Sequence, residues 1–300
     1  MEILSFTTQW ANGDKSVRVG SPLTADYLLD FERATEGMEQ PSSLPGWFDM
    51  DSPWFQEATK TYKELVSDPT KIEEAVEKGW LIKRANAYWF APIPRIGLNY
   101  RDHAAESNMP IPERPVVFSK FATSVIGPGE QVILPTSSTQ VDYEAELAVV
   151  IGRRAKNVSA SRAFDYVLGY TCFNDVQYTR AKGFDTFAPM GPTIVTSDAV
   201  PDPHKLSIKL ILNGKTMQDS NTDQLIFGVP ELVEFLSQTI TLEPGDVIAT
   251  GTPPGVGFAR KPPVFLQPGD EMQVVIEKVG FLGNSVIEAR EGVVTQAQSF

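Results

Sequence analysis

Acidic and apolar side chains alternate between Val141 and Gly152, where the sequence reads VDYEAELAVVIG. Because successive side chains of a β-strand point to opposite faces, a strand here would place Asp142, Glu144 and Glu146 on one face. Carboxylates two positions apart lie about 6–7 Å apart along a strand, and near a buried region they repel each other. A hard divalent cation such as Mg²⁺, Mn²⁺ or Ca²⁺ would remove that cost. A solvated acidic strand face is the structural alternative.

Asp175 could supply a third ligand, because the predicted strand at 166–176 is nearly all apolar until Asn174 and Asp175 near its end. An acid at the end of a buried strand can bind a metal, and it can equally belong to a turn. Lys182 follows seven residues later. A lysine beside the metal would stabilise an anion that the metal alone does not neutralise, whereas an exposed lysine is the simpler interpretation.

A histidine and a glutamate are spaced three residues apart, at His103 and Glu106. If residues 102–106 are helical, the two side chains share a face, and the carboxylate would orient the imidazole and raise its basicity. Such a pair suits a base that activates water, although a surface pair is the alternative. His204 is the only other histidine and is expected to be structural, so a histidine-rich zinc site is excluded.

The stretch TGTPPGVG, from Thr250 to Gly257, is rich in glycine and proline. Its glycines allow the backbone to approach a ligand closely, but the lysine and spacing of a phosphate-binding loop are missing. A rigid turn is the alternative.

Positioning these residues requires strands and turns, and the 23 prolines and 22 glycines favour a β-rich chain. A helix is expected at 229–237, and Asn213-Gly214 indicates a hairpin turn. Strands are expected at 115–119, 131–134, 141–151, 166–176, 206–212, 247–249 and 271–276.

Pro92 and Pro94 mark a boundary, because two prolines two positions apart are not expected inside a helix or a central strand. We therefore expect a small N-terminal α+β domain at 1–91 and a catalytic domain at 92–300. In the first, a short helix is expected after Ser21. Two helices are expected within 61–80, on either side of a turn at Asp68-Pro69-Thr70.

The overall charge restricts the partners. The chain has 300 residues with 26 Lys and Arg against 38 Asp and Glu, a net charge of −12. This argues against nucleic acid or an anionic membrane as a partner, but it does not exclude a small anionic substrate. The single Cys172 cannot form an internal disulfide. We expect a cytoplasmic protein, because no secretory signal and no apolar run of about 20 residues is visible.

Taken together, these stretches resemble the fumarylacetoacetate hydrolase family, in its acylpyruvate hydrolase and oxaloacetate decarboxylase-like branch. The matching text, in collinear order, is GLNYRDHAAE, VDYEAELAVVIG, DYVLGYTCFND, AKGFDTFAPMGP and GDVIATGTPPGVG. The resemblance covers about residues 92–290. It implies a rolled mixed β-sheet domain, normally paired as a homodimer, and it identifies residues 1–91 with the variable extra domain that many members carry.

The resemblance also implies roles for individual residues. It implies Glu144, Glu146 and Asp175 as ligands of a divalent metal, usually Mg²⁺ or Mn²⁺, with Ca²⁺ conceivable in a crystal. Lys182 would lie beside the oxo-acid end of the substrate. His103 and Glu106 match a lid dyad that activates water, and Thr252 matches a threonine that holds the substrate carboxylate.

One departure from the family pattern concerns the segment between Asp175 and Lys182. Related members carry a longer segment there, with an arginine shortly after the aspartate, whereas here only residues 176–181 intervene. Gln177 and Arg180 are the candidates to replace that arginine in binding the substrate.

The function implied is hydrolysis of a carbon–carbon bond in a 2,4-dioxo acid of the acylpyruvate type. His103 would deprotonate a water that attacks the 4-carbonyl, and the electrons would pass into a pyruvate enolate stabilised by the metal and Lys182. The alternative is oxaloacetate-type decarboxylation or keto–enol tautomerisation at the same site, which needs no attacking water. A third hypothesis, a non-catalytic member, is disfavoured because all three acidic ligands are present.

Overall fold

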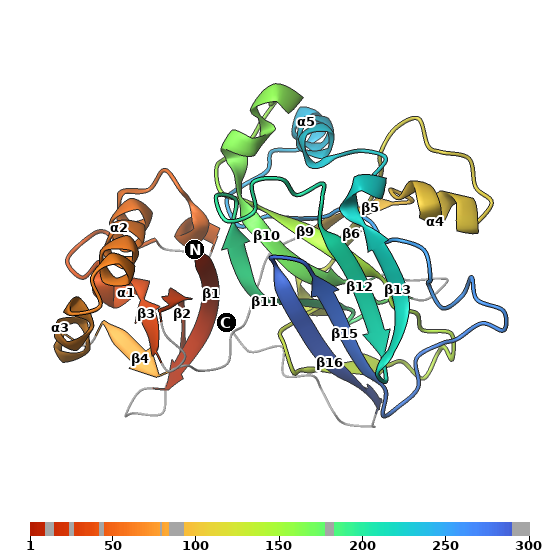
Figure 1. The fold of residues 1–300 in the computed structure, drawn as a ribbon, viewed down its shortest axis with the longest axis horizontal. Helices are drawn as coiled ribbons and strands as arrows, with labels where there is room; N and C mark the ends of the chain where they lie inside the picture. The colour runs from red at the N-terminus through yellow and green to blue at the C-terminus, as the bar shows by residue number, and fades with distance from the viewer. Residues whose placement is uncertain are drawn as a thin grey trace.

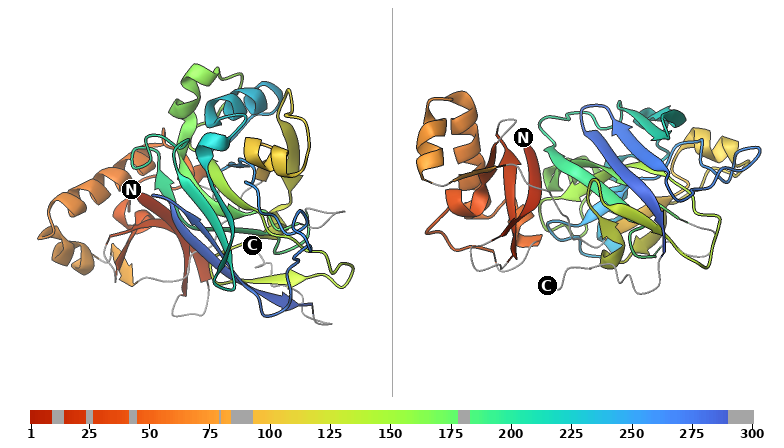
Figure 2. Two further views of the ribbon diagram at one scale, coloured as in Figure 1. Left: turned by 45° about the vertical axis from the view of Figure 1, so that its right-hand side comes forward. Right: turned by 90° about the horizontal axis from the view of Figure 1, so that it is seen from below.

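The computed structural model describes residues 1–9, 15–23, 27–41, 45–78, 80–83, 93–177 and 183–289. Most of the described strands form one long mixed sheet, and a smaller sheet packs on one of its faces (Figures 1 and 2). The strands of the long sheet are β1 (Glu2–Gln9), β2 (Lys15–Pro22), β3 (Tyr27–Asp30), β4 (Leu81–Lys83), β5 (Ile93–Gly97), β6 (Val116–Lys120), β7 (Val125–Ile126), β9 (Ala145–Ile151), β10 (Val167–Asn174), β11 (Ala188–Thr196) and β14 (Val247–Ala249). The smaller sheet contains β8 (Gln131–Leu134), β12 (Ser207–Leu212), β13 (Lys215–Asn221), β15 (Glu271–Ile276) and β16 (Gly280–Glu288).

Helices cover the ends and outer faces of these sheets (Figure 1). The α-helices are α1 (Phe31–Ala34), α2 (Pro53–Ser67), α3 (Lys71–Glu77), α4 (Arg101–Glu106) and α5 (Val229–Thr239), and short 3₁₀ helices span Pro45–Phe48, Ala122–Ser124, Ala160–Tyr166 and Thr222–Gln224. The strand order is β4-β3-β2-β1-β11-β10-β9-β14-β5-β6 in the long sheet, with β7 beside β11, and β13-β12-β15-β16-β8 in the smaller sheet. The mixed, β-rich α+β class expected from the sequence is therefore confirmed.

The alternation seen along residues 141–151 places the two faces of β9 in two different cores. Leu147 and Val149 pack between the two sheets, together with apolar residues of β12 and β15. Ala148 and Val150 face the other way, into a core shared with the N-terminal segment. Glu144 and Glu146 have the parity of Ala148, so they point away from the core between the sheets.

The N-terminal segment continues the long sheet. β1 pairs antiparallel with β11, through Glu2 with Val195 and Ile3 with Ile194. The short helix expected directly after Ser21 is not found in the described residues there: β2 runs to Pro22, residues 24–26 lie outside the described residues, and the chain returns as β3 between β2 and β4 before the short helix α1. The buried Leu28 and Leu29 of β3 account for the difference, because pairing and burial override the local capping pattern. The two helices expected within 61–80 are confirmed as α2 and α3.

Pro94 gives a second correction, because it lies inside β5, between β14 and β6. β5 and β14 pair only through Arg95 and Ala249, so the missing N–H of the proline interrupts no ladder on that side. The strands expected at 131–134, 247–249 and 271–276 have the expected bounds, as β8, β14 and β15.

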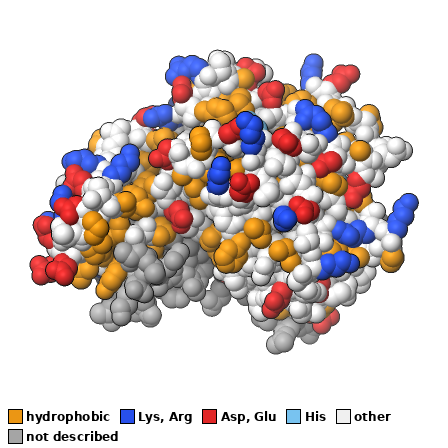
Figure 3. Space-filling view, in the orientation of Figure 1, with side chains coloured by type: hydrophobic (Ala, Val, Ile, Leu, Met, Phe, Trp, Pro, Cys, Tyr) orange, Lys and Arg blue, Asp and Glu red, His pale blue; other side chains and the backbone are white. Residues whose placement is uncertain are grey.

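The surface in Figure 3 carries acidic and basic side chains interspersed over the face shown. None of the helices in the described part of the chain combines the length and apolar character needed to cross a membrane.

Candidate metal centre and active site

Three acidic side chains meet where β9 begins and β10 ends. β9 and β10 pair antiparallel, with Ala145 opposite Asn174, and the N–H of Asp175 donates to the carbonyl of Glu144 at 2.8 Å. This register brings carboxylate oxygens of Glu144, Glu146 and Asp175 within 4.8 Å of one another. Their exposed fractions are 5%, 2% and 0%. The solvated acidic face considered from the sequence is therefore excluded for this cluster.

Buried carboxylates at this spacing fit a hard divalent cation, which accepts oxygen ligands and cancels their repulsion. Several groups hold them in place. The N–H of Gly251 donates to Glu146 Oε2 at 2.7 Å, and the side chain of Asn174 accepts the N–H of Glu144 at 3.1 Å. The arrangement supports a divalent-metal centre formed by the three acids.

Lys120 is a residue of this centre that the sequence analysis missed. It ends β6, is 3% exposed, and its ammonium lies 2.9 Å from Asp175 Oδ1. It also donates to the carbonyls of Val176, at 2.6 Å, and Phe187. The available signal was a lysine, Lys120, at the end of the apolar strand that follows Pro115. Nothing in the local sequence indicates that its side chain points into the protein.

The residues expected to contact the substrate beside the metal are described only in part. Lys182 and Arg180 lie outside the described residues. The side-chain amide of Gln177 donates to Glu144 Oε1, and its backbone exchanges hydrogen bonds with Asp142. Gln177 therefore holds the carboxylate of Glu144 directly.

His103 and Glu106 form the expected pair on α4. His103 Nδ1 lies 3.2 Å from Glu106 Oε2; His103 is only 6% exposed, whereas Glu106 is exposed, so the imidazole is the buried member of the pair. The Glu106 carboxylate also accepts the N–H of Gly255, at 2.9 and 3.1 Å. The imidazole is thereby oriented by a carboxylate that is itself fixed by the backbone.

The Thr250–Gly257 loop joins the dyad to the metal centre, because Gly251 binds Glu146 and Gly255 binds Glu106. Gly255 has a φ of +100°, and a Cβ there would collide with the carbonyl of Met217. The close approach predicted for this loop is therefore made to protein groups.

Asp142 anchors the far end of that loop by accepting the N–H groups of Gly257 and Phe258, each at 2.7 Å. Burial raises the pKa of the Asp142 carboxyl to about 6, although these hydrogen bonds and that of Tyr143 lower it. Asp142 thus supports the loop, while its neighbour Glu144 points to the metal centre.

Thr252 lies in the same loop and is 5% exposed. Its hydroxyl accepts from Gln218 Nε2 at 2.8 Å and donates to the carbonyl of Ala145 at 3.0 Å. The hydroxyl hydrogen is therefore engaged within the protein.

His204 has the structural role expected of it. Its Nε2 accepts the N–H of Val229, the first residue of α5, at 3.0 Å. This requires a neutral ring, and burial lowers the pKa of His204 below 6.5.

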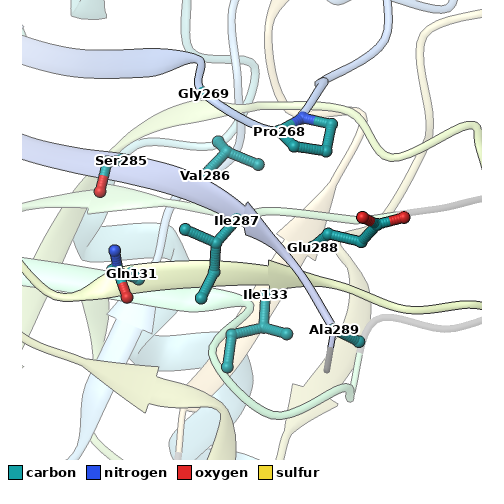
Figure 4. A pocket seen from close by; sticks show the side chains of 9 residues that line it. All are labelled: Gln131, Ile133, Pro268, Gly269, Ser285, Val286, Ile287, Glu288 and Ala289. Atoms are coloured by element: carbon teal, nitrogen blue, oxygen red, sulfur yellow. The ribbon is translucent and has the colours of Figure 1, made fainter. Parts of the chain in front are cut away.

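A cavity of about 760 Å³ lies elsewhere, beside the paired strands β8 and β16 (Figure 4). Its lining includes Ile133, Val286 and Ile287, and Glu288 is the acidic residue among them. None of the expected site residues that the structure describes lines this cavity.

Comparison with known proteins identifies the family of this chain. The family model described as "Fumarylacetoacetate (FAA) hydrolase C-terminal" matches residues 93–287. Oxaloacetate tautomerase FAHD2A, mitochondrial, from Bos taurus is 47% identical over 225 residues, covering 69% of this chain and 72% of the relative. These similarities confirm the family expected from the sequence motifs.

Two solved structures of similar fold are enzymes. 5-Carboxymethyl-2-hydroxymuconate delta-isomerase from Mycobacterium smegmatis has a TM-score of 0.60 and 40% identity, covering 68% of this chain and 82% of that one. Maleylpyruvate hydrolase from Sphingobium sp. SYK-6, in complex with manganese(II) ion and pyruvate, has a TM-score of 0.70 and 29% identity, covering 97% and 100%. An enzyme of the hydrolase, decarboxylase or isomerase kind is thereby confirmed.

Proposed function

The chain belongs to the fumarylacetoacetate hydrolase family, and from that premise we propose that it interconverts the keto and enol forms of a small, anionic 2-oxo acid of the oxaloacetate type. The observation that carries the proposal is the hydrogen-bonded pair of the buried His103 and the more exposed Glu106, linked through one loop to three buried carboxylates. The relatives named oxaloacetate tautomerases support the choice of substrate.

Each residue has a defined task in this reaction. His103 removes the proton from carbon 3 of the 2-oxo acid and returns it to the oxygen, and Glu106 keeps the ring oriented and stabilises its charged form. A divalent cation held by Glu144, Glu146 and Asp175, Mg²⁺ or Mn²⁺, supplies a Lewis acid for the oxo-acid end. Burial of His103 limits the access of water to the base.

Lys182 is proposed to stabilise the negative charge that develops on the substrate, and Arg180 and Thr252 to bind its carboxylate. Removing one charge-stabilising donor typically costs 10²–10³-fold in kcat, so Lys182→Ala is expected to lose about that much. An unchanged kcat would identify Lys182 as an ordinary surface lysine.

Hydrolysis of an acylpyruvate is the second candidate, because the structural match to the maleylpyruvate hydrolase covers 97% of this chain. Oxaloacetate, acylpyruvates and maleylpyruvate should be assayed after metal removal with EDTA and again with Mg²⁺ or Mn²⁺. We expect enol–keto conversion of oxaloacetate, followed by ultraviolet absorbance, to need the metal and to have the highest kcat/KM. Metal-independent conversion would contradict the proposal, and faster pyruvate release from acylpyruvates would favour hydrolysis.

Substitution of the dyad separates proton transfer from decarboxylation. A positioned general base contributes about 10²–10⁴-fold, so His103→Ala with Glu106→Ala should lower tautomerisation by that factor. Decarboxylation of oxaloacetate needs no such base and should survive. His204→Gln is the matched histidine control and should keep both activities. Equal losses in both reactions would mean that the dyad only shapes the site.

The assembly and location are also proposals. We propose a homodimer in the cytoplasm, with residues 1–91 as a small N-terminal domain that packs on the catalytic domain at 92–300. The tautomerase relative is named as mitochondrial, so location must be measured by cell fractionation.

A further inference from the structure

We infer that Gln218, which is neither a metal ligand nor a member of the dyad, is a positioning residue for the metal centre: it fixes the backbone between Glu144 and Glu146 to the loop that carries Thr252. The inference rests on the proposed metal-dependent function and adds to it a residue that reaches the site from the second sheet.

All three hydrogen bonds of the Gln218 carboxamide end at this centre. Its Oε1 accepts the N–H of Ala145 at 2.8 Å. Its Nε2 donates to the hydroxyl of Thr252 and to the carbonyl of Pro253, both at 2.8 Å. The side chain is 0% exposed, so no water competes for these partners.

Ala145 needs such a partner because of where β14 ends. β14 pairs with β9 as far as Ala249 opposite Ala148, and Thr250 then donates to the carbonyl of Leu147. Beyond that point no strand in the described part of the chain faces the N–H and carbonyl of Ala145 on this side. The amide of Gln218 and the hydroxyl of Thr252 take the two places that a strand would fill.

The directions of these bonds are determined by chemistry. A carbonyl only accepts, so the Thr252 hydroxyl must donate to Ala145, and the bond from Ala145 N–H fixes which end of Gln218 is oxygen. Ala145, Thr252 and Gln218 therefore form a closed triangle. Because Ala145 lies between Glu144 and Glu146, and Gly251 beside Thr252 binds Glu146, displacing the triangle would move both glutamates.

A β-bulge in β13 orients the side chain of Gln218 toward Ala145. β12 and β13 pair in one register at Leu210 with Gln218 and in another at Ile211 with Thr216, so Met217 is an extra residue. Such a bulge re-aims a side chain, and here Met217 and Gln218 are both buried although adjacent.

The test compares metal affinity with stability. Gln218→Met keeps the volume of the side chain and removes its three hydrogen bonds. Asn284→Leu is the matched control, because Asn284 is a buried amide that binds the carbonyls of Gly127 and Glu130, away from the centre. Mn²⁺ binding to EDTA-treated protein is measured by isothermal titration calorimetry, with thermal unfolding measured in parallel.

Loss of a group that orients metal ligands typically weakens binding 10–100-fold, and we expect this for Gln218→Met. Asn284→Leu should lower the unfolding temperature but change the affinity less than about 2-fold. If Gln218→Met does not fold, Gln218→Asn, which keeps an amide that is too short for all three bonds, should show the weaker binding. Wild-type affinity in the folded Gln218 variants would overturn the inference.

Glu144→Gln separates this result from a failure of the proposed function. Metal binding that is lost in Glu144→Gln but unchanged in Gln218→Met would overturn the inference alone. An EDTA-treated wild-type protein that binds no Mn²⁺ would overturn both the metal-dependent function and the inference.

Discussion

Charge at the centre is a physical reason to expect a divalent metal. Among the described residues, Glu144, Glu146 and Asp175 contribute three negative charges from buried positions, and Lys120 contributes a positive charge beside Asp175. Burying three carboxylates close together is costly unless cations pair with them, and a dication bound by all three would lower that cost.

Replacing Lys120 tests this pairing of charges. Lys120→Met leaves Asp175 buried without its 2.9 Å partner, and breaking a buried ion pair on one side typically costs about 3–5 kcal/mol. We expect the free energy of unfolding of the metal-free protein to fall by about that amount in urea titrations. Mn²⁺ should restore a larger share of stability in the variant than in the wild type.

Lys209→Met is the control for this prediction, because the Lys209–Asp219 pair has a similar separation, 3.1 Å, but is largely exposed. Exposed pairs contribute about 0–1 kcal/mol. Equal effects of the two substitutions would show that Lys120 has no special electrostatic role.

At the scale of elements, what could be predicted from the sequence depended on how local the signal was. The alternation along 141–151 predicted that Glu144, just before β9, and Glu146, within it, point to the same side, because side-chain direction repeats every two residues. Lys120 and Gln218 could not be found this way. Their partners lie 55 and 73 residues away, at Asp175 and Ala145, and depend on how two sheets pack.

The elements of the N-terminal segment show the same limit. Its two amphipathic helices were predictable from capping and a proline turn, whereas β3 was not, because its two neighbours come from 15–22 and 81–83. Pro94 in β5 was missed for a related reason, since a single-residue pairing with β14 leaves room for a proline.

Helix α5 provides a pH-dependent prediction at this scale. The neutral ring of His204 caps its first N–H, and burial lowers the pKa of His204 below the unfolded value of 6.5. Asp202 and Glu231 oppose this shift, and Lys205 adds to it. The stabilisation is therefore complete above pH 6.5 and is lost as the pH falls from 6.5 through the folded pKa.

We expect the urea stability of the wild type to fall more steeply between pH 7 and pH 5 than that of His204→Gln, whose amide oxygen can accept the same N–H without binding a proton. Parallel pH profiles for the two proteins would show that the cap does not depend on the protonation of His204.

At the scale of the whole molecule, β6 is an apolar edge of the long sheet. Val116, Val117 and Phe118 are between 41% and 46% exposed, and an open apolar strand edge favours pairing with another chain. If the homodimer uses this edge, the wild type should sediment at about twice the 33.0 kDa chain mass, and Val117→Lys should sediment as a monomer. Phe281→Lys, which alters the 63% exposed Phe281 on β16, should remain a dimer. A monomeric wild type would contradict the expected homodimer.

The continuity of the long sheet across residue 92 leads to a prediction about the domain boundary expected there. The family model begins at residue 93, but the residues before it belong to the same sheet and core. β1 covers the edge of β11, and Ile3, Phe31 and Trp54 share the core on the outer face of β9. A chain that begins at residue 92 would expose Ala148 and Val150 and leave β11 with an open edge. We therefore expect it to aggregate in size-exclusion chromatography, to bind an apolar dye and to lose its cooperative thermal transition. A shortened chain that stays dispersed, unfolds cooperatively and keeps the Mn²⁺ affinity of the full chain would instead establish residues 1–91 as an independent domain, and the shared core would then contribute little to the catalytic fold.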